Sequence, residues 1–523
     1  MVAERLETFL AAARGSGRSP PRFVEREFRR FLECGVLAHG FLRVRCDACR
    51  SERLVPFSCK GRGFCSSCGG RRMADTAAHL VDRVLPEAPV RQWVLSLPFR
   101  LRYRMAYDAR LTADVLRIFV RRVFASLRRR ARRRLRPAGA TAERAADLRC
   151  GAVTFVQRFG GALNLNVHFH TLVLDGVLHR TGDRLRFRPL PPPDGREVAR
   201  VAESVARAIG RLLQRRGLGA TADPEESDPL VREEPLLAAL ASASTAGRVA
   251  MGSRAGQRAF RFGDHVDVDD LPARAGRRCA SVGGLSIHAD VAVPARDRRR
   301  LERLCRYAAR PALALERLSL LPDGRLVYRL KQRWRDGTTH VGFEPLELME
   351  RLASLVPPPR FNLVRYHGVL APAARDRARV VETVPQPQTF RPERSGQHGQ
   401  HRQPCSGCVG NENENDAGRH VEKPVRELPR PDGRAAGAGI PSTATPPRHP
   451  LRPRNCSWAE LMRRVFEVDV LECPACHGRM RILAAIHPPE ATVAILECLG
   501  LPTRAPPIAP AMVPARTDSE LDF

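Results

Sequence analysis

The chain has almost no lysine and no apolar run long enough to cross a bilayer. Of its 88 lysine and arginine residues, only Lys60, Lys331 and Lys423 are lysines. The missing apolar run excludes a membrane-spanning class of protein, and the first residues lack an apolar core of signal-peptide length. We therefore expect a cytoplasmic chain with no membrane partner. Its 15 cysteines should then be metal ligands or reduced thiols rather than disulfides.

What the chain has in excess is arginine. The formal net charge is +32, against only 56 acidic residues. A GC-rich coding bias would explain arginine in place of lysine, but it would not explain the excess of basic over acidic residues. Such an excess favours a polyanionic partner, most simply nucleic acid, and therefore a nucleoid-associated protein.

Shifts in composition divide the chain into five segments. Apolar residues make up 43%, which is enough for substantial cores, but the part after about residue 375 is rich in Pro, Gly, Gln and Asn and cannot build one. The segments are a helical, zinc-binding, DNA-binding domain over 1–90, a main domain over 91–372, a disordered linker over 373–455, a small C-terminal Cys-x-x-Cys module over 456–502 and a disordered tail over 503–523.

Two Cys-x-x-Cys pairs lie in the first segment, Cys46 with Cys49 and Cys65 with Cys68. Each pair places two thiolates on one side of a tight turn, and two pairs complete a tetrahedron, which is typical of a structural zinc ribbon. The sequence therefore predicts one four-cysteine Zn²⁺ site. Cys59 is a fifth candidate that could replace one of the four. A closed set of four thiolates leaves no open position, so this zinc would hold structure.

A third pair, Cys473 and Cys476, lies in the C-terminal module and provides only half of a zinc site. The remaining ligands could come from Cys405 with Cys408, from Cys456, from His477 or from another subunit.

Residues 164–176, with the sequence NLNVHFHTLVLDG, predict a β-strand that ends in an Asp-Gly turn. Because side chains at i and i+2 share a face of a strand, His168 and His170 should project together, with Phe169 turned the other way. Two imidazoles on one face can chelate a divalent ion. The alternative is a pair of half-buried histidines that make ordinary hydrogen bonds.

A predicted helix over 296–310 carries Tyr307 near its end. The simplest account of this residue is an amphipathic tyrosine at the edge of a core. The other account is a nucleophile surrounded by phosphate-binding arginines. A phenol is a poor nucleophile at its ordinary pKa, but adjacent guanidinium groups and a metal-polarised phosphate would both help it. The arginines that flank it are Arg303, Arg306 and Arg310.

The cysteines from Cys46 to Cys68, the strand over 164–176 and the segments 304–311 and 334–343 together resemble the HUH endonuclease transposases of rolling-circle insertion sequences. The resemblance is to the type with an N-terminal transposase zinc-binding domain, and it covers roughly residues 20–372. It implies an α+β fold with a zinc ribbon and an RRM/ferredoxin-like catalytic core. In that core an antiparallel sheet carries the two histidines on its central strand, with helices behind.

The resemblance also implies the chemistry. His168 and His170 would bind Mg²⁺ or Mn²⁺, and Tyr307 would attack the scissile phosphate of single-stranded DNA to give a 5′-phosphotyrosine link and a free 3′-OH. A third metal ligand is expected, and Gln157 on the neighbouring strand is the candidate. Many relatives carry two tyrosines four residues apart, whereas here Arg303 and Pro311 hold those positions, so the chain resembles a one-tyrosine variant.

The function implied is that of a transposase that nicks and rejoins single-stranded DNA at insertion-sequence ends during rolling-circle transposition, with target DNA as a further partner. Whether it acts as a homo-oligomer is left open. The alternatives are a non-catalytic zinc-ribbon DNA-binding protein, a plasmid or phage HUH replication nickase, and a decayed transposase copy.

Overall fold

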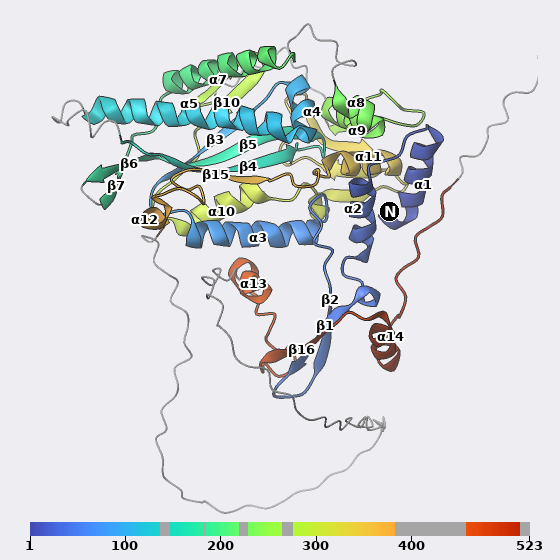
Figure 1. Cartoon of the computed structure of the whole chain (residues 1–523). Helices are drawn as coiled ribbons and strands as arrows, with labels where there is room; N and C mark the ends of the chain where they lie inside the picture. Colours follow the sequence, from blue (N-terminus) through green and yellow to red (C-terminus); the bar gives the residue numbers. More distant parts are fainter. Residues whose placement is uncertain (136–146, 182–183, 219–227, 264–275, 382–456, 513–523) are drawn as a thin grey trace, which may run out of the picture. The chain divides into compact units, whose positions relative to one another are not determined.

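The computed structural model describes residues 1–135, 147–181, 184–218, 228–263, 276–381 and 457–512. Most of the expected linker and the end of the expected tail lie outside these ranges. Within them, the fold is α+β with antiparallel sheets (Figure 1), which confirms the predicted fold class. None of the described helices combines the length and the hydropathy that a bilayer-spanning segment needs.

The main sheet is seven-stranded and antiparallel, and the histidine-bearing strand β5 lies in its middle. Six of its strands follow the spatial order β15-β4-β5-β3-β10-β9. Strand β11 pairs with Val90 and Arg91 at the start of β3. The central place of β5 agrees with the predicted core. The strands are β3 (Val90–Ser96), β4 (Gly151–Phe159), β5 (Leu165–Leu174), β9 (Cys279–Val282), β10 (Leu285–His288), β11 (Ala292–Val293) and β15 (Val364–Gly368).

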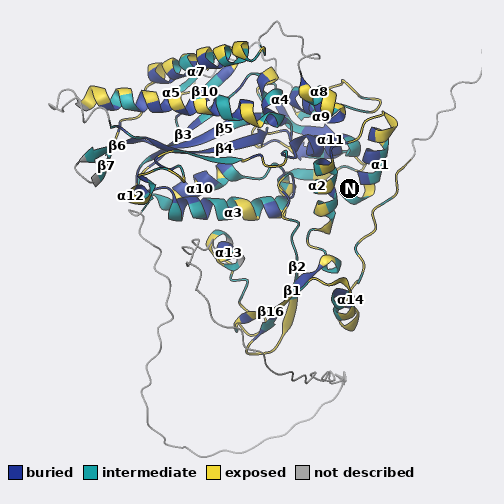
Figure 2. Ribbon diagram, viewed as in Figure 1, coloured by how far each residue is buried: buried dark blue, intermediate teal, exposed yellow. Residues whose placement is uncertain are grey.

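Helices cover both faces of this sheet, because β5 is apolar on both sides. Phe169 packs toward α5 and α7, whereas Leu172 packs toward α3 and α10. Figure 1 shows α5 and α7 on one face and α3 and α10 on the other. In Figure 2 the strands are buried, while the outer faces of α5 and α7 are exposed. The helices are α3 (Ser66–Arg83), α4 (Phe99–Tyr107), α5 (Ala109–Leu135), α7 (Gly195–Arg215) and α10 (Arg298–Ala309).

A second, four-stranded sheet follows the order β12-β13-β14-β8. Its hairpin turns contain Gly324 and Gly337, both with positive φ, and each glycine follows an aspartate, a dipeptide typical of tight turns. It shares a core with α1, α2, α9 and α11. The elements are β8 (Phe260–Gly263), β12 (Leu318–Leu320), β13 (Leu326–Arg329), β14 (Thr338–Phe343), α1 (Val2–Gly15), α2 (Arg22–Glu33), α8 (Pro229–Glu233), α9 (Pro235–Ala246) and α11 (Pro345–Leu355).

A third sheet joins segments from the two ends of the chain. Strands β1 and β2 form a hairpin, and β16 pairs antiparallel with β1. The C-terminal segment, which the sequence suggests as a module of its own, therefore completes an N-terminal sheet. The remaining elements are η1 (Leu37–His39), β1 (Phe41–Cys46), β2 (Glu52–Pro56), β6 (Gly176–Thr181), β7 (Arg184–Pro189), η3 (Leu315–Arg317), α12 (Arg377–Val381), α13 (Trp458–Phe466), β16 (Met480–Ile486) and α14 (Pro489–Cys498).

Candidate active site and cysteine clusters

The two strand histidines lie side by side on the α10 face of the main sheet. Their ring centroids are 4.9 Å apart, as the strand alternation predicts. His168 is paired across the sheet with Ser96 on β3 and with Gln157 on β4. These neighbours share its face, so the histidines lie in a polar patch of an otherwise apolar sheet.

Hydrogen bonds orient both imidazoles. His168 Nδ1 lies 2.9 Å from the Asn166 carbonyl oxygen. Since a carbonyl oxygen only accepts, Nδ1 carries the proton and Nε2 keeps a free lone pair. Nε2 of buried Gln92 lies 2.8 Å from His170 Nδ1 and donates to it, which puts the His170 proton on Nε2. A half-turn of this amide would present its oxygen to Nδ1–H instead and free Nε2 for a ligand. Burial lowers the pKa of His168 to about 4 and that of His170 to about 3. Both rings are therefore neutral near pH 7, the form that binds metal ions.

Tyr307 lies beside these histidines. Its ring is 5.8 Å from that of His170 and nearly perpendicular to it, at 87°. The residue occupies the last turn of α10, whose buried side chains Leu304 and Ala308 fix the helix on the sheet. Tyr307 itself is 38% exposed. A large ligand approaching from solvent could therefore reach a phenol that lies next to the histidine pair.

Two cations flank the tyrosine ring. The Arg310 guanidinium carbon is 5.3 Å from the ring centroid and the Lys331 Nζ is 4.5 Å from it. Arg310 ends α10, whereas Lys331 follows β13 of the second sheet. Lys331 is not among the site residues that the sequence predicts, since its contact with Tyr307 depends on how the two sheets meet. Its one local signal is that it is a lysine in an arginine-rich chain.

The other two predicted arginines lie farther along the same helix. Arg303 is exposed one turn before Tyr307, and Arg306 is half-buried with its Nε 4.0 Å from Glu302 Oε1. Contact of Arg303, Arg306 and Arg310 with DNA stays a prediction.

Gln157, the candidate third ligand, lies under the end of α10. Its Nε2 donates to the carbonyl oxygens of Tyr307 (3.2 Å) and Ala308 (2.8 Å), which satisfies two acceptors that a helix end leaves open. Its Oε1 is buried and has no hydrogen-bond partner among the described residues. An unpaired buried amide oxygen is costly, so this atom is available for a ligand next to the histidines.

The cysteines expected to form one zinc site fall into two clusters, so the predicted grouping is wrong. Cys59, the fifth candidate, belongs to the first cluster, and Cys34 was missed because it lies outside any Cys-x-x-Cys pair. His477, one suggested ligand for the C-terminal pair, instead contacts Glu472. The first cluster contains Cys34, Cys59, Cys65 and Cys68, and the second contains Cys46, Cys49, Cys473 and Cys476.

The hairpin of β1 and β2 explains the division. It pairs Phe41 with Pro56 at its base and Arg45 with Glu52 near its tip, which puts Cys46 and Cys49 at the tip. Five strand residues span roughly 16 Å, far more than the diameter of a four-sulfur site. Cys34 and Cys59, which precede and follow the hairpin, meet at its base instead.

The first cluster, defined by Cys34, Cys59, Cys65 and Cys68, has the dimensions of a zinc site. Its Sγ atoms lie 3.5 to 3.8 Å apart in the three closest pairs. Four sulfurs at about 2.3 Å from a tetrahedral zinc lie about 3.8 Å from one another. The fit with Zn²⁺ is therefore direct.

This first cluster packs against the end of the tyrosine helix. Cys65 and Cys68 begin α3, and a Cβ added at Gly69 would lie 2.7 Å from Pro311, just after α10. Arg62 also donates to the carbonyl oxygen of Phe361, which lies between α11 and β15. The first cluster thus buttresses the helix turn that carries Tyr307.

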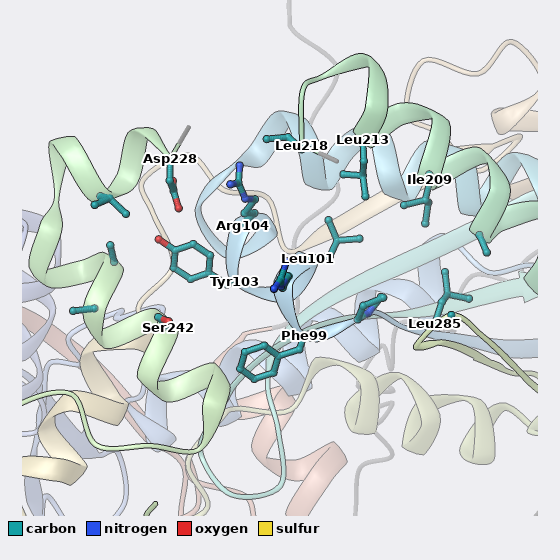
Figure 3. A pocket seen from close by; sticks show the side chains of 18 of the residues that line it. Phe99, Leu101, Tyr103, Arg104, Ile209, Leu213, Leu218, Asp228, Ser242 and Leu285 are labelled. Carbon is teal, nitrogen blue, oxygen red and sulfur yellow. The ribbon is translucent and has the colours of Figure 1, made fainter. Parts of the chain in front are cut away.

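A cavity of about 810 Å³ lies apart from these groups, between α4, α7 and α9. Figure 3 shows Tyr103 of α4 with its hydroxyl turned toward Asp228, among apolar side chains such as Ile209 and Leu213. Burial and Asp228 raise the pKa of Tyr103. Residues 219–227, between two lining residues, lie outside the described ranges, and none of the lining residues belongs to the histidine–tyrosine site.

Comparisons with known proteins agree with this geometry. Residues 2–97 match the family described as "Transposase zinc-binding domain", and residues 151–378 match the family described as "Putative transposase". No curated protein and no solved structure matches the chain. The first match contains the first cysteine cluster, and the second contains both histidines and Tyr307. Taken together, the two matches fit a transposase of the IS91 type with an N-terminal zinc-binding domain.

Proposed function

We propose that this transposase nicks and rejoins single-stranded DNA at the ends of an insertion sequence during rolling-circle transposition. The observation that carries the proposal is the exposed Tyr307 ring, which lies between two cations and beside two neutral histidines, half-buried His168 and buried His170. That arrangement suits attack of a phenol oxygen on a phosphodiester.

The groups around Tyr307 fit a small divalent cation. Two imidazole nitrogens and the unpaired amide oxygen of Gln157 form a mixed nitrogen and oxygen donor set that suits Mn²⁺ or Mg²⁺. Bound by His168, His170 and Gln157, such an ion would polarise the scissile phosphate as a Lewis acid. Asn166 holds the His168 ring with Nε2 free, and Gln92 would do the same for His170 with its amide turned so that the oxygen accepts from Nδ1–H.

The chain's own residues account for the transfer. The Tyr307 hydroxyl loses its proton as its oxygen bonds to phosphorus, and the bond from phosphorus to the 3′ oxygen breaks. The departing 3′ oxygen takes up one proton to become the 3′-OH, so the protons balance. Arg310 and Lys331 offset the negative charge of the phosphate during attack. The phosphotyrosine ester keeps the energy of the broken bond, so attack by a 3′-OH can rejoin strands without ATP.

Each chain supplies one such nucleophile. The positions one turn before and after Tyr307 hold Arg303 and Pro311, so a single chain holds one covalent DNA end at a time. A second simultaneous cleavage would use the Tyr307 of another chain, which makes a homo-oligomer part of the proposal.

The experiment uses oligonucleotides that span the ends of the encoding element, incubated with Mn²⁺ and the full chain. A denaturing gel should show a covalent protein–DNA species with the 3′-labelled strand, and a shorter fragment with an extendable 3′-OH from the 5′-labelled strand. Tyr307→Phe should lose both products. Tyr366→Phe, which changes a half-buried tyrosine on β15, is the matched control and should keep them.

The outcomes separate the rival functions. Salt-sensitive DNA binding without any covalent species on the correct ends would favour a non-catalytic DNA-binding protein. Cleavage of plasmid or phage origin strands but not of element ends would favour a replication nickase. A covalent link that survives in Tyr307→Phe would move the nucleophile to another residue.

A further inference from the structure

The two ends of the chain meet at the second cysteine cluster. Cys46 Sγ lies 3.5 Å from Cys476 Sγ, and Cys49 Sγ lies 3.6 Å from Cys473 Sγ. These distances are far longer than a disulfide bond of about 2.05 Å and close to the spacing of about 3.8 Å around a tetrahedral zinc. The four sulfurs all lie within 4.8 Å of one another.

The two halves of this cluster have the same backbone turn. The Arg50 amide donates to the Cys46 carbonyl oxygen (3.2 Å), and the His477 amide donates to the Cys473 carbonyl oxygen (2.8 Å). Arg50 and His477 hold equivalent positions and have φ values of 65° and 57°. Positive φ is uncommon for residues other than glycine. Its occurrence at the same place in both turns indicates that each turn is shaped to aim two thiolates at one point.

The two turns that carry the cysteines lie in close contact with each other. A Cβ at Gly478 would lie 2.9 Å from the Ala48 Cβ, 3.0 Å from Cys46 Sγ and 3.2 Å from Cys476 Sγ. The Asp47 amide also donates to the Arg479 carbonyl oxygen at 3.0 Å. The two turns are thus packed directly against each other.

Little apolar surface is buried where β16 meets β1 at the second cluster. The buried cluster contains only Val44, Cys46, Cys473 and Met480, while Ile482 on β16 is 54% exposed. A three-stranded sheet with so little buried apolar surface usually needs a metal or a disulfide to hold it, and all the described cysteines are free thiols.

The segment held there also contacts the catalytic part of the chain. Leu461 of α13 packs on Ala74 and Ala78 of α3. Arg464 donates to Asp82 of α3 and, at 2.7 Å, to Glu302 of the tyrosine helix α10. A metal at the second cluster would therefore fasten a segment that itself braces α3 against α10.

We infer that Cys46, Cys49, Cys473 and Cys476 form a second structural zinc site, which fastens residues 457–512 to the N-terminal domain. Four thiolates from two turns close the coordination sphere, so this zinc stabilises structure and leaves no position for a substrate. The site goes beyond the proposed DNA chemistry and does not depend on it.

The test is the metal content of the purified full chain, which needs no DNA. Mass spectrometry of metals should find about two zinc atoms per chain. Cys46→Ser/Cys49→Ser and Cys473→Ser/Cys476→Ser should each lose one, and the four-fold variant should lose no more than either pair, since both pairs hold the same ion. Cys498→Ser, which removes an exposed thiol outside both clusters, is the control and should keep two.

A second measurement tests the fastening. In Cys46→Ser/Cys49→Ser the C-terminal segment is unaltered, yet the amides of β16 should lose their protection from hydrogen exchange. Two zinc atoms retained in either pair variant, additive loss in the four-fold variant, iron in place of zinc, or unchanged β16 protection would each overturn the inference. If a pair variant does not fold, Co²⁺ titration of the wild-type chain should give thiolate absorption up to two equivalents, and saturation at one would count against the site.

Discussion

The histidine pair and the second cysteine cluster differ in how far apart in sequence their residues lie. The two histidines are neighbours on one face of β5, so local strand geometry alone brings them together. The second cluster joins Cys49 to Cys473 across 424 positions. A strand period can therefore place two residues on one face, but it cannot decide which pairs of cysteines meet.

The two regions also differ in their effect on the stability of the fold. The site beside Tyr307 holds half-buried His168 and buried His170, whose pKa values burial lowers, and an unpaired amide oxygen. Such groups destabilise a fold unless a ligand satisfies them. The cysteine clusters fit an ion whose binding supplies folding energy. Substitutions in the pocket should therefore remove chemistry and spare the fold, whereas substitutions in the clusters should do the reverse.

The largest expected effect is in the pocket. His168→Ala and His170→Ala should each lower single-strand cleavage at least about a thousand-fold, because loss of metal polarisation is worth several kcal/mol of barrier. DNA binding and the melting temperature should stay close to wild type, since an uncharged buried polar group is exchanged for a methyl group. Cleavage gels, filter binding and thermal melting on the same preparations measure all three.

The control for this pair is His340→Ala, which changes a strand histidine of the second sheet that contacts Thr339. It should retain cleavage. Loss of DNA binding or of folding in the two pocket variants would mean that the histidines are structural, and the contrast between the two regions would fail.

The next effect compares the two clusters. Cys59→Ser/Cys68→Ser should lower both the melting temperature and cleavage, because the first cluster packs against Pro311 at the end of the tyrosine helix. Cys473→Ser/Cys476→Ser should lower cleavage less, since α13 still contacts α3 and α10 through Leu461 and Arg464. Melting curves and cleavage rates give the order. Equal losses of cleavage in both variants would contradict a special link between the first cluster and Tyr307.

The sequence predicts the parts of this architecture that are set by local geometry. The strand that bears His168 and His170, with the Asp-Gly turn at its end, and the helix that bears Tyr307 both follow from hydrophobic period and turn chemistry. The central position of β5 came from the family resemblance. Lys331 and the grouping of the cysteines depend on how distant elements pack, which no local pattern encodes.

The cysteine error has a specific cause. Cys46 and Cys65 each begin a Cys-x-x-Cys pair, and any two such pairs can complete a tetrahedron of thiolates. The decisive fact is that β1 and β2 form a hairpin between Phe41 and Pro56. Its length separates the pair at its tip, Cys46 with Cys49, from the pair that follows its base. A strand prediction over 41–56 would have been the signal, because it places Cys34 and Cys59 at the base of the hairpin.

A moderate effect is expected at Gln157. Gln157→Leu removes the unpaired Oε1 and both hydrogen bonds to the end of α10, so cleavage at limiting Mn²⁺ should fall about 10- to 100-fold. Raising Mn²⁺ should restore part of the rate. Gln157→Glu keeps an oxygen ligand, so it should reach half of its maximal cleavage rate at a lower Mn²⁺ concentration than Gln157→Leu. The same Mn²⁺ dependence in wild type and Gln157→Leu would remove Gln157 from the metal site and leave it as a support for α10.

The smallest effect is expected at Lys331, the one pocket cation supplied by the second sheet. Its Nζ lies 4.5 Å from the Tyr307 ring centroid, but the side chain is exposed, so water and salt screen its charge. Lys331→Met should lower cleavage about ten-fold or less, and Lys331→Arg should keep most of the rate.

The control is Arg329→Met, two residues earlier on β13, which removes an exposed cation of the same hairpin and should change the cleavage rate little. Because the effect is electrostatic, the gap between wild type and Lys331→Met should narrow as salt is raised. A gap that persists in high salt would mean that Lys331 holds the hairpin against α10 rather than acting through its charge.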